Sequence, residues 1–177
     1  MKATGIVRRI DDLGRVVIPK EIRRTMRIRE GDPLEIYTDA GGEVIFKKYS
    51  PIGELSTFAS QYADALLKGT QLAVVICDRD RCVAAAGLPK REVLERRNSV
   101  ALEDIMQSRR FFTARGEQIN ALDGVDRRIC VAAPIISAGD VTGAVALLST
   151  ESAETPTETD IKLVQVAAGF LGKQMEE

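Results

Sequence analysis

The sequence predicts an α+β protein that is divided into two domains. The chain has 177 residues, of which 45% are apolar, so it is long enough for two small domains and too apolar to remain disordered. Its charge is divided unevenly: residues 1–29 hold nine basic and three acidic side chains, a net charge of +6, whereas the whole chain carries −1. Short β-branched segments fill residues 1–50, and long helical periodicity begins only after them.

Residues 1–50 are expected to form the first domain, with short strands around one short helix. Two β-branched segments flank a turn that contains Gly14, and Pro19 begins a helix because its fixed φ and missing N–H suit the first helical position. Gly41 and Gly42 then lie in the turn of a hairpin. The expected elements are a strand over 4–10, a turn over 11–14, a strand over 15–18, a helix over 19–26, and hairpin strands over 34–38 and 44–48.

A unit of this size buries too little surface to be stable by itself. We therefore expect the first domain to be completed by a second copy of the chain. A homodimer follows from the size of the unit before any family is considered.

Residues 51–71 are expected to form a linker helix that is also the first helix of the second domain. Ser50 is placed as its N-cap, Pro51 as its first residue and Gly69 as the residue that ends it. Its apolar residues follow a helical stripe: Leu55, Phe58, Ala59, Tyr62, Ala63, Leu66 and Leu67.

Residues 72–177 are expected to form the rest of the second domain. The predicted elements are strands over 72–77 and 81–86, two helical pieces within 90–110, a polar segment over 114–127, hairpin strands over 128–136 and 141–149, and a closing helix. A capping box at residues 155–158 marks the start of that helix.

The closing helix is apolar on two faces. One face contains Val164 and Leu171 and can cover its own sheet, whereas the other contains Val166 and Phe170 and needs a partner. We expect this second face to join dimers into a tetramer.

The composition excludes several enzyme classes. The chain has no histidine, so a Ser-His-Asp or Cys-His catalytic site is impossible and a zinc site would lack its usual ligands. Cys77, Cys82 and Cys130 lie in apolar segments without ligand spacing and are expected to be reduced and buried. We expect no enzymatic activity, no cofactor and no metal. The chain also lacks an apolar run long enough to span a membrane, which favours the cytoplasm.

The basic end of the chain is the candidate binding site. Arginine suits planar, bidentate contact with phosphate or with a guanine edge, which lysine cannot provide. Arg23 and Arg24 follow the predicted helix start, with Ile22 and Met26 on a buried face opposite them. A solvated charged surface is the alternative, but the net charge of +6 favours binding to double-stranded DNA.

The segment TGIVRRIDDLGRVVIPKEIRRTMRIREGDPLEIYTDAGGEVIFKKY closely resembles the DNA-binding domain of the AbrB family of bacterial regulators. The resemblance implies a swapped-hairpin β-barrel formed by a dimer. It also implies DNA contacts by Arg8, Arg15, Arg23 and Arg24, with Arg9 and Lys20 as weaker matches. The same fold occurs in antitoxins, which usually carry a toxin-binding tail instead of a second domain.

The remainder, and above all the hairpin VAAPIISAGDVTGAVALLS, resembles a GAF domain. The resemblance implies a GAF-like α/β sandwich with an antiparallel sheet. GAF domains often bind small molecules, so residues 114–127 are a candidate lid over an unidentified effector or, equally, a surface loop without a ligand. A domain used only for oligomerisation, or a thiol-dependent sulfoxide reductase built on the cysteines, are further alternatives.

Together the two domains resemble sporulation regulators of endospore-forming bacteria. The resemblance implies a transcription regulator that activates some genes and represses others late in spore development.

Overall fold

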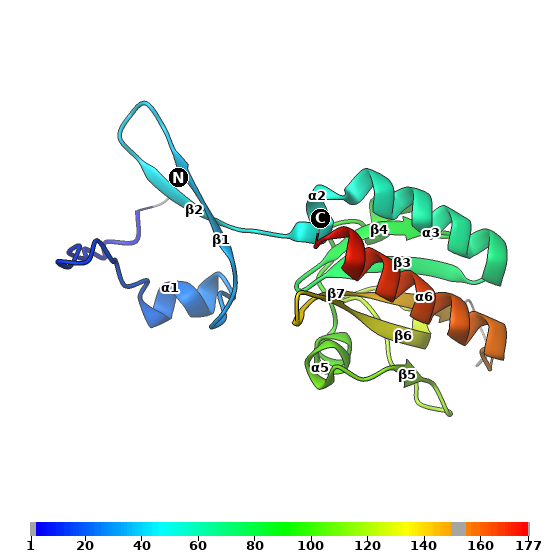
Figure 1. Ribbon diagram of the computed structural model, residues 1–177. Coiled ribbons are helices and arrows are strands. Elements are labelled where there is room, and N and C mark those ends of the chain that lie inside the picture. The colour runs from blue at the N-terminus through cyan, green and yellow to red at the C-terminus, as the bar shows by residue number, and fades with distance from the viewer. Residues whose placement is uncertain (1–2, 150–154, 177) are drawn as a thin grey trace. The chain divides into compact units, whose positions relative to one another are not determined.

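The structure is a computed structural model that describes residues 3–149 and 155–176. Contacts divide the chain into two compact units, Met1–Tyr49 and Ser50–Glu177. Figure 1 shows the first unit in blue and cyan and the second from cyan to red. Both units contain helices and strands, so the predicted α+β class is confirmed.

The first unit contains one helix and one hairpin. Helix α1 spans Lys20–Thr25, and the strands β1 (Leu34–Thr38) and β2 (Val44–Lys48) pair antiparallel with Ile36 opposite Phe46. The hairpin turn contains Gly42 in the left-handed region (φ +84°), and Gly42 N–H donates to Asp39 C=O at 3.1 Å. The predicted helix and hairpin are therefore both confirmed.

The two strands predicted over residues 4–10 and 15–18 do not form within one chain, which corrects that prediction. The turn between them is present, and Asp11 N–H donates to Arg15 C=O at 3.0 Å, but no ladder continues from it. Extended chain becomes a strand only when a neighbour accepts its hydrogen bonds, and the described part of this chain provides none. Met26 is likewise 59% exposed, contrary to the predicted buried face.

The first unit leaves most of its large apolar side chains in contact with solvent. Val7 is 83% exposed and Val17 is 71% exposed, and α1 contains no buried residue. Other exposed apolar residues of this unit are Ile6, Ile10, Leu13, Val16, Met26, Ile36, Tyr37, Val44, Phe46 and Tyr49. An apolar surface of this extent on a small unit is typical of an interface.

The second unit is built on a five-stranded antiparallel sheet with strand order β4-β3-β7-β6-β5. The strands are β3 (Ala73–Asp78), β4 (Cys82–Ala86), β5 (Phe112–Thr113), β6 (Arg128–Ser137) and β7 (Asp140–Ser149). Four of these strands were predicted to within two residues. Strand β5 was not predicted, because two residues are too few to show a period.

Helices cover both faces of this sheet. On one face lie α2 (Pro51–Glu54), α3 (Ser56–Thr70) and α6 (Glu158–Gln174), and on the other lie α4 (Lys90–Val93) and α5 (Val100–Ser108). Alternate residues of each strand enter the two cores: Val74 and Ile76 pack toward α3 and α6, whereas Val75 and Cys77 pack toward α5. The predicted α/β sandwich is thus confirmed, and Figure 1 shows α3 and α6 lying together over the sheet.

The single helix predicted over 51–71 is divided at Leu55 into α2 and α3, and two helix termini also differ from the prediction. Helix α3 continues through Gly69 and ends with Gln71 in the left-handed region (φ +61°), because Gln71 N–H donates to Leu67 C=O. Gly69 instead gives room to α6, since a Cβ there would lie 3.3 Å from the Leu163 side chain. Helix α6 is capped by Thr157 with Asp160 in a capping box, two residues beyond the predicted cap.

Candidate nucleic-acid interface

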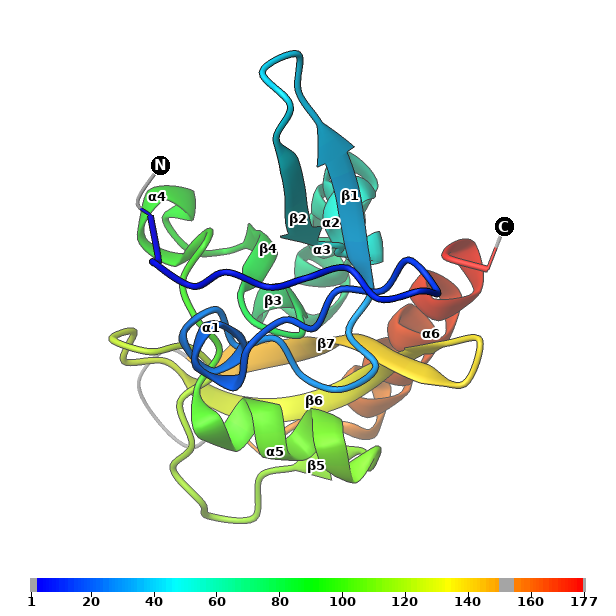
Figure 2. The ribbon, with the colours of Figure 1, turned by 90° about the vertical axis from the view of Figure 1, so that its left-hand side faces the viewer.

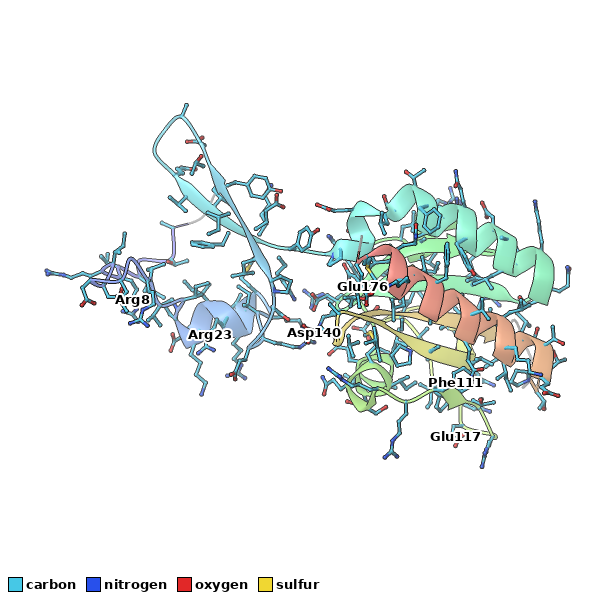
Figure 3. The ribbon with its side chains drawn as sticks, in the orientation of Figure 1. Arg8, Arg23, Phe111, Glu117, Asp140 and Glu176 are labelled. Carbon is cyan, nitrogen blue, oxygen red and sulfur yellow. The ribbon has the colours of Figure 1, made fainter. Side chains whose placement is uncertain are left out.

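The six predicted DNA-contacting residues are all exposed on the first unit. Arg8, Arg9 and Arg15 lie in segment 3–18, which precedes α1, and Lys20, Arg23 and Arg24 lie on α1. Figure 3 labels Arg8 and Arg23, and both lie away from the tip of the β1–β2 hairpin. In Figure 2, helix α1 also lies away from that tip.

Helix α1 is short, and its C-terminus fixes the backbone that carries two of these arginines. Ile28 N–H donates to Arg23 C=O at 2.8 Å, and Arg27 N–H donates to Arg24 C=O at 3.3 Å. This is a Schellman motif, with Arg27 in the left-handed position usually taken by glycine (φ +51°). Arg23 and Arg24 also lie in the last turn, where the helix dipole favours positive charge.

A buried carboxylate joins the end of α1 to the hairpin. The Asp32 side chain is 3% exposed and lies 3.6 Å from Lys48 Nζ, and its Oδ2 accepts the Arg29 N–H at 2.8 Å. Lys48 Nζ also donates to Arg27 C=O at 2.9 Å. Asp32 and Lys48 therefore hold α1 against β2. Sequence reasoning missed this pair, because residues 31–33 indicate only a chain break.

Arg15 is held by the carboxylate of Asp11. Arg15 Nε donates to Asp11 Oδ2 at 2.8 Å, and the Arg15 backbone N–H donates to Asp11 Oδ1 at 2.8 Å. These hydrogen bonds, first that of the backbone and then that of the guanidinium, lower the pKa of Asp11. The contact is on the surface: the Arg15 side chain is 69% exposed and that of Asp11 38%.

The remaining cations are available to an anion. In residues 3–149 and 155–176, no ion pair engages the side chains of Arg9, Lys20, Arg23 or Arg24. The Arg8 guanidinium contacts only the neighbouring Val7 carbonyl, at 3.3 Å. The arrangement can therefore bind phosphate without first breaking internal salt bridges, except at Arg15.

The polar segment 114–127 of the second unit is anchored at its centre. Ala121 and Leu122 are buried, Ile119 C=O accepts the Ile129 N–H at 2.7 Å, and Asn120 C=O accepts the Ser99 hydroxyl at 2.7 Å. Only its first part, residues 115–118, is continuously exposed. The segment is thus partly core, packed on the α5 side of the sheet.

A shallow groove of about 290 Å³ lies on the opposite side of the sheet, beside α6. Phe111, Pro134 and Ile136 form part of its wall, together with Arg109 and Gln165. The groove is therefore separate from the candidate lid.

The three cysteines are free and buried. Cys77 and Cys82 lie opposite each other on β3 and β4, and a hydrogen bond with Cys82, together with burial, raises the pKa of Cys77 well above its ordinary value. A raised pKa disfavours the nucleophilic thiolate. In the described part of the chain, no three His, Cys, Asp or Glu side chains gather into a possible metal site. No described helix has the length and apolar character needed to cross a bilayer.

Comparison with known proteins agrees with this division into units. The family described as "Stage V sporulation protein T C-terminal, transcription factor" matches residues 54–176, and "Antidote-toxin recognition MazE, bacterial antitoxin" matches residues 7–53. Stage V sporulation protein T of Bacillus subtilis is 51% identical over 180 residues, which cover 100% of both chains.

Two further proteins resemble one unit each. The transition state regulatory protein AbrB of Bacillus subtilis is 63% identical over 51 residues, 29% of this chain and 52% of that protein. The blue-light absorbing form of the PixJ GAF domain of Thermosynechococcus elongatus has a TM-score of 0.52 at 11% identity, and the match covers 73% of this chain and 89% of that one. The second unit therefore has the GAF fold, and the chain as a whole belongs to the stage V sporulation protein T family.

Proposed function

We propose that this protein is a DNA-binding transcription regulator of late sporulation genes, which activates some promoters and represses others. The observation that carries the proposal is the set of exposed cations on the first unit, of which Arg9, Lys20, Arg23 and Arg24 have no ion pair in the described residues. Arginines in such a state bind phosphate at little internal cost. Membership of a family described as transcription factors supports the same function.

The DNA-binding form is a homodimer of interleaved first units. Segment 3–18 exposes Val7 and Val17, and among the described residues no strand pairs with it. A second copy would pair with its backbone and cover its apolar side chains, closing a barrel. This dimer would bring two copies of Arg8, Arg15, Arg23 and Arg24 onto one two-fold surface.

The mechanism of recognition follows from two-fold symmetry and from arginine chemistry. A symmetric dimer predicts roughly symmetric DNA sites. Guanidinium groups bind phosphate or guanine edges in bidentate fashion, and they also favour narrow grooves. Arginines that read DNA shape as well as base edges would give a loose consensus sequence.

The second unit joins such dimers into a tetramer. Phe58 and Tyr62 on α3 and Phe170 on α6 form an aromatic cluster with ring centroids 5.7–6.3 Å apart. Phe170 is 43% exposed, and the neighbouring Val166 is 62% exposed. Helices α3 and α6 of a second copy would cover this surface in a four-helix contact.

A small-molecule effector, so far unidentified, would act through the same contact. Such a ligand would change the spacing between the DNA-binding first units only if it binds one arrangement of α3 and α6 more tightly than another. The second unit therefore has oligomerisation as its first role and sensing as a compatible second one.

An antitoxin is the second candidate function, because residues 7–53 match the antitoxin family. The full-length relative and the folded second unit favour the regulator instead. A thiol reductase is the weakest alternative, since all three cysteines are buried and the pKa of Cys77 is raised.

The test is DNA affinity measured against salt concentration, for the wild type and for Arg8→Ala, Arg15→Ala and Arg24→Ala, on a sporulation promoter and on random duplex. Each substitution should weaken binding and reduce the salt slope by about 1 for each phosphate that is no longer bound. Arg91→Ala, an exposed arginine of the second unit, is the matched control and should have no effect.

Binding that is unaffected by these substitutions would mean that the charges form a solvated surface. Tight binding to a toxin-like protein, with only weak binding to DNA, would favour the antitoxin function. A promoter preference that persists at high salt would add direct sequence recognition to the phosphate contacts.

A further inference from the structure

We propose that Asp11 is a positioning residue for DNA recognition by Arg15. It orients the Arg15 guanidinium through one N–H group, leaves the outer edge of the guanidinium open to DNA, and opposes indiscriminate binding to phosphate with its own charge. The inference rests on the proposed function, because it concerns how one of the DNA-contacting arginines acts.

Both carboxylate oxygens of Asp11 are engaged with the turn that carries Arg15. Oδ1 accepts the backbone N–H of Leu13 at 3.0 Å and that of Arg15 at 2.8 Å, and Oδ2 accepts Arg15 Nε at 2.8 Å. The backbone adds two bonds, since Asp11 N–H donates to Arg15 C=O and Gly14 N–H donates to Asp11 C=O. Because the carboxylate is fixed from both sides, it can fix the arginine in turn.

The hydrogen bond uses only one of the donors of the guanidinium. A guanidinium has five N–H groups in a planar fork, and Arg15 uses the one on Nε. Within the described residues, the terminal Nη groups of Arg15 have no acceptor, and the side chain is 69% exposed. The two terminal nitrogens can therefore still bind a phosphate or a guanine edge in bidentate fashion.

The negative charge of Asp11 acts against phosphate in general. It partly neutralises Arg15 in the free protein, so any phosphate must approach a carboxylate as well as a cation. A DNA acceptor that lies in line with the two terminal nitrogens of Arg15 binds more tightly because the guanidinium is already oriented. A phosphate in another position interacts only with a charge that Asp11 has partly neutralised. The arrangement lowers affinity for random DNA more than affinity for a matched site, which is a gain in specificity.

Asp12 provides the matched control. It is the next residue, carries the same charge and is exposed, but it has no hydrogen bond or ion pair to Arg15. Asp12→Asn therefore removes the same formal charge from the same turn. Asp11→Asn leaves an amide oxygen that can still accept the backbone N–H groups, so the turn can persist while the charge is lost.

The experiment measures salt-dependent affinity of the full chain for a promoter fragment and for random duplex, with Asp11→Asn and Asp12→Asn compared. Asp11→Asn should bind random duplex roughly threefold to tenfold more tightly near 0.1 M salt, with a steeper salt slope and a promoter preference reduced by a similar factor. Asp12→Asn should change the preference less than twofold. In an Arg15→Ala background, Asp11→Asn should no longer alter the preference, a coupling that a purely structural role would not produce.

Equal effects of Asp11→Asn and Asp12→Asn would overturn the inference. The proposed function would survive that result if Arg15→Ala still weakens binding, and would fail by itself if the wild type does not bind DNA.

Arg15→Lys tests the inference without altering Asp11, in case Asp11→Asn fails to fold. Lysine keeps the charge but lacks the planar guanidinium and its Nε–H, so promoter preference should fall roughly threefold to tenfold, because affinity for the promoter falls more than affinity for random duplex. A preserved promoter preference in Arg15→Lys would overturn the inference.

Discussion

Single glycine residues set how closely helix α6 approaches the sheet. A Cβ built on Gly172 would lie 2.1 Å from the Ile136 carbonyl oxygen, so at this point the helix contacts the backbone of β6 directly. Gly169, one turn earlier in the same helix, has nothing within 4 Å of such a Cβ. Alanine at Gly172 therefore tests close packing against β6, whereas alanine at Gly169 tests only the low helix propensity of glycine.

Gly172→Ala is expected to destabilise the protein, because the methyl group must displace either α6 or the backbone of β6. The cost of such overpacking is about 1–3 kcal/mol. Gly169→Ala should instead be neutral or stabilise by about 0.5–1 kcal/mol, since alanine favours the helix more than glycine does. Urea unfolding followed by circular dichroism measures both, and equal stability of the two variants would contradict the direct contact between α6 and the β6 backbone.

At the scale of elements, the first unit contains extended chain that lacks a neighbour. Asp11 and Arg15 close a turn, Asp32 and Lys48 connect α1 to β2, and the hairpin pairs with itself. Segment 3–18, in contrast, is paired with no strand in the part of the chain that the structure describes, and it leaves Val7 and Val17 exposed. We therefore expect a second copy of the chain to complete this element.

The fragment 1–50 is therefore expected to be a dimer in solution. Light scattering should give the mass of two chains, because dimer formation buries the apolar side chains of segment 3–18. Val17→Asp should shift the fragment toward monomer, since the new carboxylate would be buried without a partner. A folded monomeric fragment would contradict the interleaved barrel.

At the scale of the whole molecule, each unit has its own exposed apolar surface. The surface of the first unit lies on segment 3–18 and the hairpin, and that of the second unit lies around Phe170 on α3 and α6. One contact would join two first units into a dimer, and the other would join two such dimers into a tetramer. Such linkage raises the effective concentration of the second DNA-binding dimer once the first is bound.

Phe170→Asp is expected to convert the proposed tetramer into a dimer while the fold is retained, because Phe170 is partly exposed within a single chain. Analytical ultracentrifugation should show the mass halved, and affinity for a DNA fragment with two sites should fall about tenfold or more because avidity is lost. Val100→Asp, on α5 at the other face of the sheet and 71% exposed in the wild type, is the control. An unchanged mass for Phe170→Asp would contradict the proposed contact.

The candidate site was predictable from sequence in its residue types and only partly in its geometry. Pro19 and the arginine spacing indicated a helix that exposes Arg23 and Arg24, and the structure contains that helix. The DNA contacts of these residues stay a prediction. The bond between Asp11 and Arg15, and the buried pair of Asp32 and Lys48, were not foreseen, because no periodic pattern marks a side-chain contact that a turn or a distant strand creates.

The amino-acid sequence by itself determined four of the five strands of the second unit, a change of domain near residue 50, and the inward faces of α3 and α6. These features depend on local periods, on caps such as Ser50, and on turn residues, all of which are read within a few positions. Only the tertiary structure decided that α3 runs through Gly69, that β5 lies at the sheet edge, and that segment 3–18 forms no strand with the other described residues. Each of these outcomes depends on whether residues far apart in the chain come into contact. Local sequence patterns do not show such contacts.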